Sequence, residues 1–283
     1  MAEEHALAFD CEDERLIGIV SLPDTPGAAA ATRGVMIVVG GPQYRAGSHR
    51  QFTLLARKLA DEGVAVMRFD YRGMGDSEGM QRGFESVGAD LRSALDAFFG
   101  AVPSLREVAL CGLCDGACAA AFYAGQDPRV RGLMLLNPWV RTEQGAARAT
   151  LRHYYRARLF SKEFWRKLAS GRFDPSAAFA SVLALLRRAR SGAEDGAVAA
   201  QALPERMYRH LAGFGGPVLL VLSGADLTAQ EFAGLENTSP AWRRLLHGAN
   251  VTRRDLPEAD HTFSLRAWHD EAVEHACTWL RAW

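Results

Sequence analysis

The chain has 283 residues, with 33 basic and 33 acidic side chains, so its formal net charge at pH 7 is zero. This balance gives no electrostatic footprint for nucleic acid or for an anionic membrane, and we expect a small, roughly neutral partner instead. The length is sufficient to bury a sizeable core, in one large α/β domain or in two smaller ones.

The sequence gives no sign of export or of a membrane span. Its first ten residues, MAEEHALAFD, contain no basic segment followed by an apolar core, which a secretory signal would need. No apolar run approaches the ~18 residues of a membrane span. We therefore expect a cytoplasmic protein. Its five cysteines, an odd number, are expected to be reduced thiols and not a disulfide framework.

In chain order, strand-like and helix-like segments alternate. Residues 5–22 alternate in polarity around a turn-like stretch at 11–14, which predicts an antiparallel hairpin, and a Pro/Gly/Ala linker follows at 23–33. Six further strands are predicted, at residues 34–41, 63–70, 107–112, 130–137, 217–224 and 251–257. Helical patterns occupy residues 49–63, 86–101, 115–126 and 267–283. This alternation predicts right-handed βαβ units and a mainly parallel central sheet with flanking helices.

The alternation stops after Asn137-Pro138. Residues 139–212 contain only helix-like segments and a low-complexity stretch, which predicts a helical cap inserted into a core domain made of residues 1–138 and 213–283. Such an insertion at the carboxyl edge of the sheet would lie over the ligand site. The alternative is a surface appendage. Its aromatic residues either line an acyl pocket or form the core of the insertion itself: Trp139, Tyr154, Tyr155, Phe164 and Trp165.

The stretch VALCGLCDGACAA, residues 108–120, carries the predicted nucleophile. Gly112, Cys114 and Gly116 form a G-x-C-x-G pattern between an apolar strand and a small-residue helix, which is the context of the G-x-S-x-G nucleophile elbow. The glycines leave room for a tight turn, and the amino terminus of the helix favours a thiolate. Cys114 is therefore predicted to be the nucleophile, and the alternative is a buried structural thiol.

The spacing of Cys111 and Cys114 is also that of a redox or zinc pair. However, Cys111 falls inside the predicted strand, where the pleat fixes its side chain, and no second Cys or His pair lies nearby to complete a zinc site. We expect Cys111 and Cys118 to be buried structural thiols.

A base and an acid complete a predicted triad. His261, in DHTF at 260–263, follows the last predicted strand, and Asp226 follows the strand at 217–224, which gives the chain order nucleophile, acid, histidine. Asp226 would orient the imidazole and leave its second nitrogen free to take the thiol proton. Glu231 is the weaker candidate because it falls inside the next helix, and Asp260 is expected to point away from its neighbour His261.

Backbone amides are predicted to bind the developing oxyanion. One is the N–H of Asp115, directly after the nucleophile, and the other comes from GGPQYR at 40–45. Gly41 is favoured there and Gln43 is the second choice, since Pro42 has no N–H. Gln43, Tyr44 and Arg45 are predicted to contact substrate. Arg45 either holds a substrate carboxylate or phosphate or is simply solvated.

With these residues in place, the chain resembles an α/β hydrolase. FDYRGMGDSEG, residues 69–79, resembles the D-x-R-G-x-G-x-S loop of that superfamily, and the likeness runs over most of the chain outside the cap. More narrowly, GGPQYRAGSHRQF, RFDYRGMGDSEG and GLCDGA resemble the exosortase A system-associated hydrolase 1 family, whose members are associated with bacterial exopolysaccharide and protein-sorting gene clusters. In having a cysteine at the elbow, the chain also resembles dienelactone hydrolases, which use a Cys-His-Asp triad in this fold.

The predicted function is cleavage of an ester or thioester through a covalent acyl intermediate on Cys114. Because a thioester intermediate reacts readily with amines, transfer of the acyl group to an amine or alcohol in a biosynthetic pathway is the alternative. A non-catalytic binding protein with the same fold is a third possibility. The expected partner is a small-molecule acyl substrate, and one alternative is an acyl group carried as a thioester on coenzyme A or a carrier protein. We expect no metal and no organic cofactor, because a triad and oxyanion donors suffice.

Overall fold

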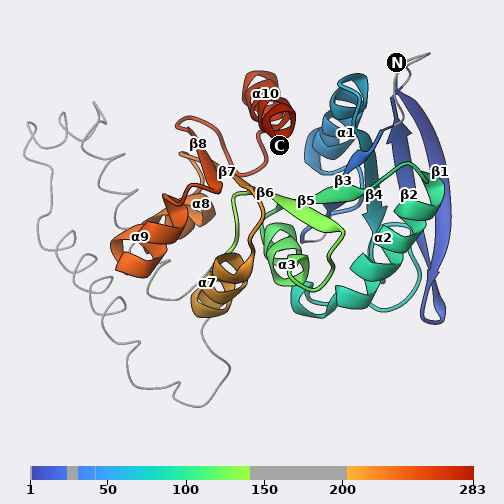
Figure 1. The fold of residues 1–283 in the computed structure, drawn as a ribbon, viewed down its shortest axis with the longest axis horizontal. Helices are drawn as coiled ribbons and strands as arrows, with labels where there is room; N and C mark the ends of the chain where they lie inside the picture. The colour runs from blue at the N-terminus through green and yellow to red at the C-terminus, as the bar shows by residue number, and fades with distance from the viewer. Residues whose placement is uncertain (1, 24–30, 42, 141–202) are drawn as a thin grey trace, which may run out of the picture.

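The computed structural model describes residues 2–23, 31–41, 43–140 and 203–283, which form one eight-stranded sheet in the order β1-β2-β4-β3-β5-β6-β7-β8 (Figure 1). The strands are β1 (Glu3–Cys11), β2 (Glu14–Leu22), β3 (Arg33–Val38), β4 (Ala65–Asp70), β5 (Glu107–Leu113), β6 (Val130–Leu136), β7 (Val218–Ser223) and β8 (Val251–Leu256). The β1–β2 and β2–β4 pairs are antiparallel, and all other pairs are parallel. The predicted amino-terminal hairpin and mainly parallel sheet are confirmed.

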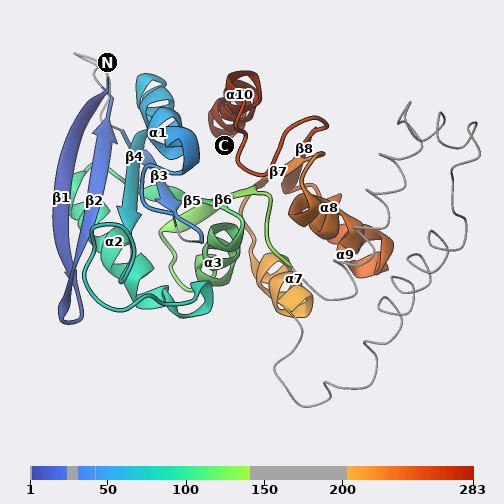
Figure 2. The ribbon, with the colours of Figure 1, turned by 180° about the vertical axis from the view of Figure 1, so that it is seen from behind.

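Helices cover both faces of the sheet (Figures 1 and 2). The longer ones are α1 (Gln51–Asp61), α2 (Gly88–Ala101), α3 (Asp115–Ala124), α7 (Leu203–Gly213), α8 (Leu227–Gly234), α9 (Pro240–Leu246) and α10 (Arg266–Ala282). α1 and α10 pack on one face, and the other helices contribute to the apolar cluster on the opposite face. Among the described helices, none is long and apolar enough to cross a membrane.

Strand β3 shows why the sequences of the predicted strands are continuous apolar runs. Val35 and Ile37 face the cluster that contains α1 and α10, whereas Met36 and Val38 face the cluster that contains α2 and α3. All four side chains are fully buried. Successive side chains of a strand point to opposite faces, so a strand covered on both sides must be apolar at every position.

Two described parts of the predicted insertion, 139–212, pack on the core. α7 buries Met207 and Leu211 in the same cluster as α3, and the Trp139 ring lies edge-on to Phe84 with 5.6 Å between centroids. α7 therefore packs against the core although it lies within the predicted insertion, and the predicted domain bounds stay a prediction. Residues 141–202 lie outside the described residues, so the cap stays a prediction, as do the roles of Tyr154, Tyr155, Phe164 and Trp165.

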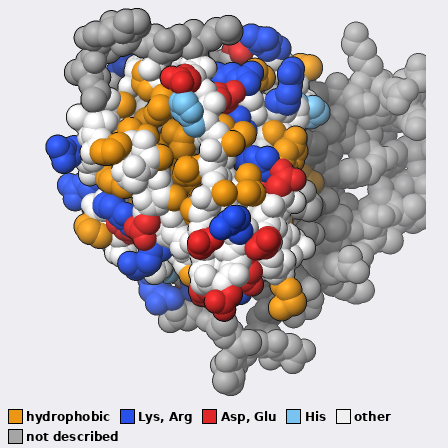
Figure 3. Space-filling model, turned by 90° about the vertical axis from the view of Figure 1, so that its right-hand side faces the viewer, with side chains coloured by type: hydrophobic (Ala, Val, Ile, Leu, Met, Phe, Trp, Pro, Cys, Tyr) orange, Lys and Arg blue, Asp and Glu red, His pale blue; other side chains and the backbone are white. Residues whose placement is uncertain are grey.

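Charged side chains of both signs are mixed on the surface shown in Figure 3, where blue and red groups lie among apolar ones. This view agrees with the zero net charge of the sequence. A cluster of buried charges lies at the loop that follows β4.

Arg72 and Asp90 form a buried ion pair that fixes this loop. Asp90 accepts hydrogen bonds from Arg72 N at 2.8 Å, from Nε at 3.0 Å and from Nη2 at 2.9 Å, and both side chains are at most 1% exposed. Glu12 and Glu14, in the β1–β2 hairpin, contact the remaining guanidinium nitrogen. The pair therefore connects the β4 loop, helix α2 and the hairpin.

We predict that Asp90→Asn lowers the free energy of unfolding by about 3 kcal/mol or more, because breaking the pair leaves the buried Arg72 charge without its buried partner. Urea unfolding measures this loss. Asp270→Asn is the matched control, since Asp270 pairs at 3.0 Å with Arg266 on the exposed face of α10, and its loss is expected to be below about 0.5 kcal/mol. Equal losses in the two variants would contradict a structural role for the buried pair.

Candidate active site

Cys114 lies at the junction of β5 and α3 in a strained backbone conformation, with φ 60° and ψ −123°. Residues other than glycine rarely adopt such angles, and they persist where the surrounding structure fixes them. Here Cys114 N donates to Leu136 O at 3.0 Å, and Trp139 N donates to Cys114 O at 3.2 Å. Both hydrogen bonds connect the turn to β6 and its continuation, which holds the half-buried side chain at the carboxyl edge of the sheet.

The glycines on either side of Cys114 allow strand and helix to meet. A Cβ at Gly112 would lie 2.4 Å from the carbonyl carbon of Gly116, and a Cβ at Gly116 would lie 2.5 Å from the carbonyl oxygen of Val38. Both distances are far below van der Waals contact. The G-x-C-x-G spacing therefore has the steric basis expected of a nucleophile elbow.

His261 and Asp226 meet beside the elbow. His261 Nδ1 donates to Asp226 Oδ2 at 2.7 Å. This hydrogen bond, followed by one with the Cys114 side chain, raises the pKa of His261 from 6.5 to about 10. The structure thus brings the three predicted triad residues together, and it favours the protonated imidazole at neutral pH. Since Nδ1 is held by Asp226, the second ring nitrogen, Nε2, is the one left for Cys114.

Asp226 is itself fixed by the start of a helix. It is the N-cap of α8, and its carboxylate accepts hydrogen bonds from Thr228 N and Ala229 N, both at 3.1 Å. Glu231 lies within α8, as expected. Asp260 instead caps its own loop by accepting from Thr262 N at 3.2 Å and Ser264 N at 2.9 Å. Asp226 is thus held by the start of α8 while it is bonded to His261.

Asn137 is a site residue that the sequence analysis used only as a boundary of the insertion. Its side chain is fully buried, and Nδ2 donates to Ser223 Oγ at 2.9 Å and to the carbonyl oxygen of His261 at 3.0 Å. Its Oδ1 accepts from Ser223 N at 2.8 Å. Asn137 thereby ties the ends of β6 and β7 to the His261 loop. Its positive φ of 44° suits asparagine better than most residues, which is a weak sequence signal in Asn-Pro.

Residues 43–45, predicted to contact substrate, differ in their environments. Arg45 pairs with Asp70 and, at 2.6 Å, with Asp76, and its amide donates to Asp70 Oδ1 at 2.5 Å. These contacts make Arg45 an anchor of the loop after β3, and they do not favour its predicted role as a substrate ligand. Tyr44 is half exposed, and the centroid of its ring lies 5.8 Å from Arg45 Cζ. Gln43 Oε1 is buried, and no described residue donates to it.

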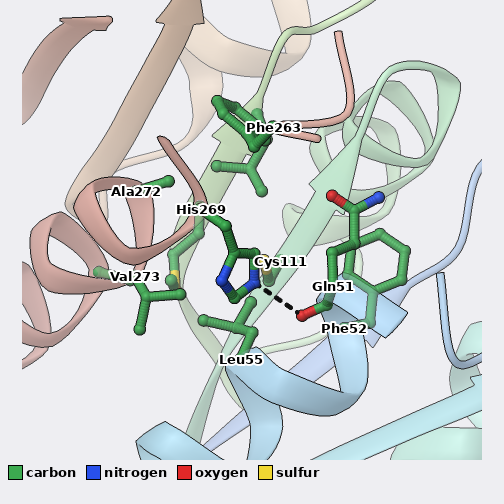
Figure 4. A pocket seen from close by; sticks show the side chains of 11 residues that line it. Gln51, Phe52, Leu55, Cys111, Phe263, His269, Ala272 and Val273 are labelled. Atoms are coloured by element: carbon green, nitrogen blue, oxygen red, sulfur yellow. Dashed lines mark hydrogen bonds between the residues drawn. The ribbon is translucent and has the colours of Figure 1, made fainter. Parts of the chain in front are cut away.

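The neighbouring cysteines have structural positions. Cys111 lines a small apolar cavity between α1 and α10 (Figure 4), and burial raises its pKa to about 12. In the same cavity His269 Nε2 donates to the carbonyl oxygen of Gln51 at 3.1 Å. Cys118 Sγ donates to Trp139 O at 2.8 Å. All five cysteines are free thiols. These environments favour the interpretation of Cys111 and Cys118 as inert thiols.

We predict that Asp226→Asn lowers the pKa of His261 from about 10 towards its ordinary value of 6.5, because the largest contribution to the increase is lost. NMR titration of the imidazole measures this shift. Glu231→Gln is the control in the same helix, and an equal shift there would make our choice of acid wrong. Since the pKa is raised in the folded protein, the stability that this proton provides is complete below about pH 6.5 and is lost as pH rises through about 10.

We predict that Asn137→Asp slows alkylation of Cys114 by iodoacetamide by about 10-fold or more, because a carboxylate cannot donate to the His261 carbonyl and small displacements of a reacting group are costly. Ser223→Ala is the matched control, because it removes only the Oγ acceptor and leaves the Asn137–His261 bond. It should slow alkylation less. Unchanged alkylation in a destabilised Asn137→Asp protein would assign Asn137 to folding alone.

Comparison with known proteins supports the same fold. The chain can be superposed on an esterase of Pyrococcus furiosus (14% identity, TM-score 0.66, covering 100% of this chain and 91% of that one). It also resembles Est1E of Butyrivibrio proteoclasticus with bound ferulic acid (15% identity, TM-score 0.64, covering 98% of this chain and 98% of that one). A third similar structure is a dienelactone hydrolase of Anabaena variabilis ATCC 29413 (15% identity, TM-score 0.60, covering 100% of this chain and 98% of that one). No curated protein sequence matches the chain.

A family model described as serine aminopeptidase, S33, matches residues 30–231, well over half of the chain. The matched range includes Cys114 and Asp226 and ends before His261. The elbow of this chain carries a cysteine, whereas the family is named for a serine. The chain belongs to the serine aminopeptidase S33 family of hydrolases and has the α/β-hydrolase fold.

Proposed function

We propose that the protein cleaves an ester or thioester through a covalent acyl intermediate on Cys114 Sγ. The observation that carries this proposal is the His261 imidazole, hydrogen-bonded to both the Asp226 carboxylate and the Cys114 side chain at the elbow. A protonated imidazole beside a thiol stabilises the thiolate, which is the nucleophilic form of cysteine. Membership of a hydrolase family and the fold shared with esterases support the same reaction class.

In the first half of the reaction, the thiolate of Cys114 attacks the acyl carbon and forms a C–S bond, while the carbonyl electron pair moves to oxygen. The carbonyl re-forms as the bond to the leaving oxygen or sulfur breaks, and that atom takes the proton of His261 Nε2. In the second half, His261 removes a proton from water, which attacks the thioester carbon. The C–S bond then breaks, and the thiolate–imidazolium pair is restored.

The substrate class in this proposal is a small acyl compound, including one carried as a thioester on coenzyme A or a carrier protein. A cysteinyl thioester exchanges with amines and thiols more readily than an oxygen ester does. Transfer to an amine or alcohol is therefore the second candidate function, favoured by cysteine at the elbow. Addition of such acceptors during turnover, with mass analysis for a condensed product, distinguishes the two fates.

We predict that Cys114→Ala lowers kcat at least about 10³-fold while the protein stays folded, because alanine fits the elbow but lacks the nucleophile. Cys114→Ser should retain a small fraction of the activity, since serine needs a stronger base. A panel of esters and thioesters, with melting temperatures of each variant, measures both effects. Cys277→Ala, which removes a buried thiol from α10, is the control and should remain active. Full activity in folded Cys114→Ala would contradict the proposed nucleophile.

A further inference from the structure

Asp70, the last residue of β4, joins two loops at the carboxyl edge of the sheet. Its fully buried carboxylate accepts hydrogen bonds from Arg45 N at 2.5 Å and from Asp76 N at 3.2 Å, and it also forms an ion pair with the Arg45 side chain. A Cβ at Gly75 would lie 2.2 Å from Asp70 Oδ2, so glycine is what lets the loop after β4 close on this carboxylate. The loops after β3 and β4 therefore share one buried anion.

Arg45 supplies the cation between these two loops. Its guanidinium contacts Asp70 with one terminal nitrogen and Asp76, at 2.6 Å, with the other, and its side chain is only 15% exposed. The planar fork of arginine suits two carboxylates at once, which a lysine ammonium does not match. The Asp76 side chain is 66% exposed, so the second ion pair lies at the surface. Arg45 is thus fixed at two points, one buried and one exposed.

The segment that ends at Arg45 begins at Gly40, against the nucleophile elbow. A Cβ at Gly40 would lie 2.2 Å from Asp115 Oδ1, in the residue directly after the nucleophile. The backbone amide of Gly41 is directed at the elbow, towards the Asp115 carboxyl. The amide expected to bind the acyl oxygen therefore belongs to a short segment with one end on the elbow and the other end at the Arg45 ion pairs.

We propose that Arg45 is a positioning residue for acylation of Cys114. Its two ion pairs hold the segment where a backbone amide, by expectation that of Gly41, donates to the acyl oxygen as negative charge forms on it. This inference rests on the proposed acyl transfer. No bond or proton changes at Arg45 while the C–S bond forms and the carbonyl electron pair moves to oxygen. Its effect on rate is geometric, since a displacement of about 1 Å can cost about 10²-fold.

Truncation of the Arg45 side chain leaves part of this attachment in place. The amide of the same residue still donates to Asp70, and the loop is still joined to α1 by the hydrogen bond from Phe52 N to Ala46 O at 3.0 Å. The guanidinium and its contact with Asp76 are lost. Arg45→Ala is therefore expected to fold, with lower stability and with the segment attached but less precisely placed.

The test compares two reactions of Cys114 in the full chain. Acylation by p-nitrophenyl acetate places charge on an acyl oxygen and is followed as a burst of nitrophenolate, whereas alkylation by iodoacetamide needs no oxyanion donor. Arg45→Ala is expected to slow acylation about 30-fold or more, and alkylation less than about 3-fold. Arg45→Lys keeps the charge without the fork, so its acylation rate should lie between those of Arg45→Ala and the wild-type protein. Arg57→Ala, which removes an ion pair with Glu4 at 2.5 Å, is the matched control and should change neither rate.

Several results would overturn the inference. Equal slowing of both reactions in Arg45→Ala would mean that Arg45 acts on the thiolate or on folding, and unchanged acylation would mean that the segment is fixed without it. If Arg45→Ala does not fold, Asp76→Asn takes its place, because it removes only the exposed ion pair. Its acylation should slow about 3-fold or more while alkylation does not, and unchanged acylation there overturns the inference. Alkylation without any acyl burst in the wild-type protein would overturn the proposed function itself, and the inference with it.

Discussion

The active site depends on the close approach of three backbone segments at the carboxyl edge of the sheet. Gly112 in β5, Gly116 in α3 and Gly40 after β3 lie so close to neighbouring atoms that a Cβ at any of them would clash. This approach forces Cys114 into its positive-φ turn and directs the α3 amino terminus at its side chain. The same contact places the Asp115 carboxyl against the loop after β3. The position and the electrostatic surroundings of Cys114, the proposed nucleophile, therefore have one steric cause.

Parallel strands explain how the other residues reach this point. β5, β6 and β7 end side by side, and so Cys114, Asn137 and the segment before Asp226 lie at one edge. The His261 loop, which follows β8, is then held through a backbone carbonyl by Asn137 and through a ring nitrogen by Asp226. Asp226 has two functions, since it also caps α8. Local stability and the orientation of the imidazole are thereby coupled at this residue.

The features that could be predicted from the sequence are those that depend on residues close together in the chain. The strand order along the chain, the elbow around Cys114, and the positions of Asp226 and His261 follow from hydrophobic periodicity and from short motifs. Contacts between distant polar side chains do not: Asn137 meets Ser223 and His261 across 86 and 124 residues. The pattern GGPQYR likewise does not show that Arg45 forms ion pairs with Asp70 and Asp76. Such pairings depend on three-dimensional packing, and polar side chains carry no periodic signal.

The proposed function requires acylation of Cys114. Its most direct test is the mass of the intact protein after brief reaction with an acyl thioester, followed by peptide mapping of any adduct. We predict a single added acyl group on the peptide that contains Cys114, removed by hydroxylamine and absent from Cys114→Ala. Turnover without any adduct, or an acyl group on another residue in a protein whose Cys114 remains unmodified, would contradict the account.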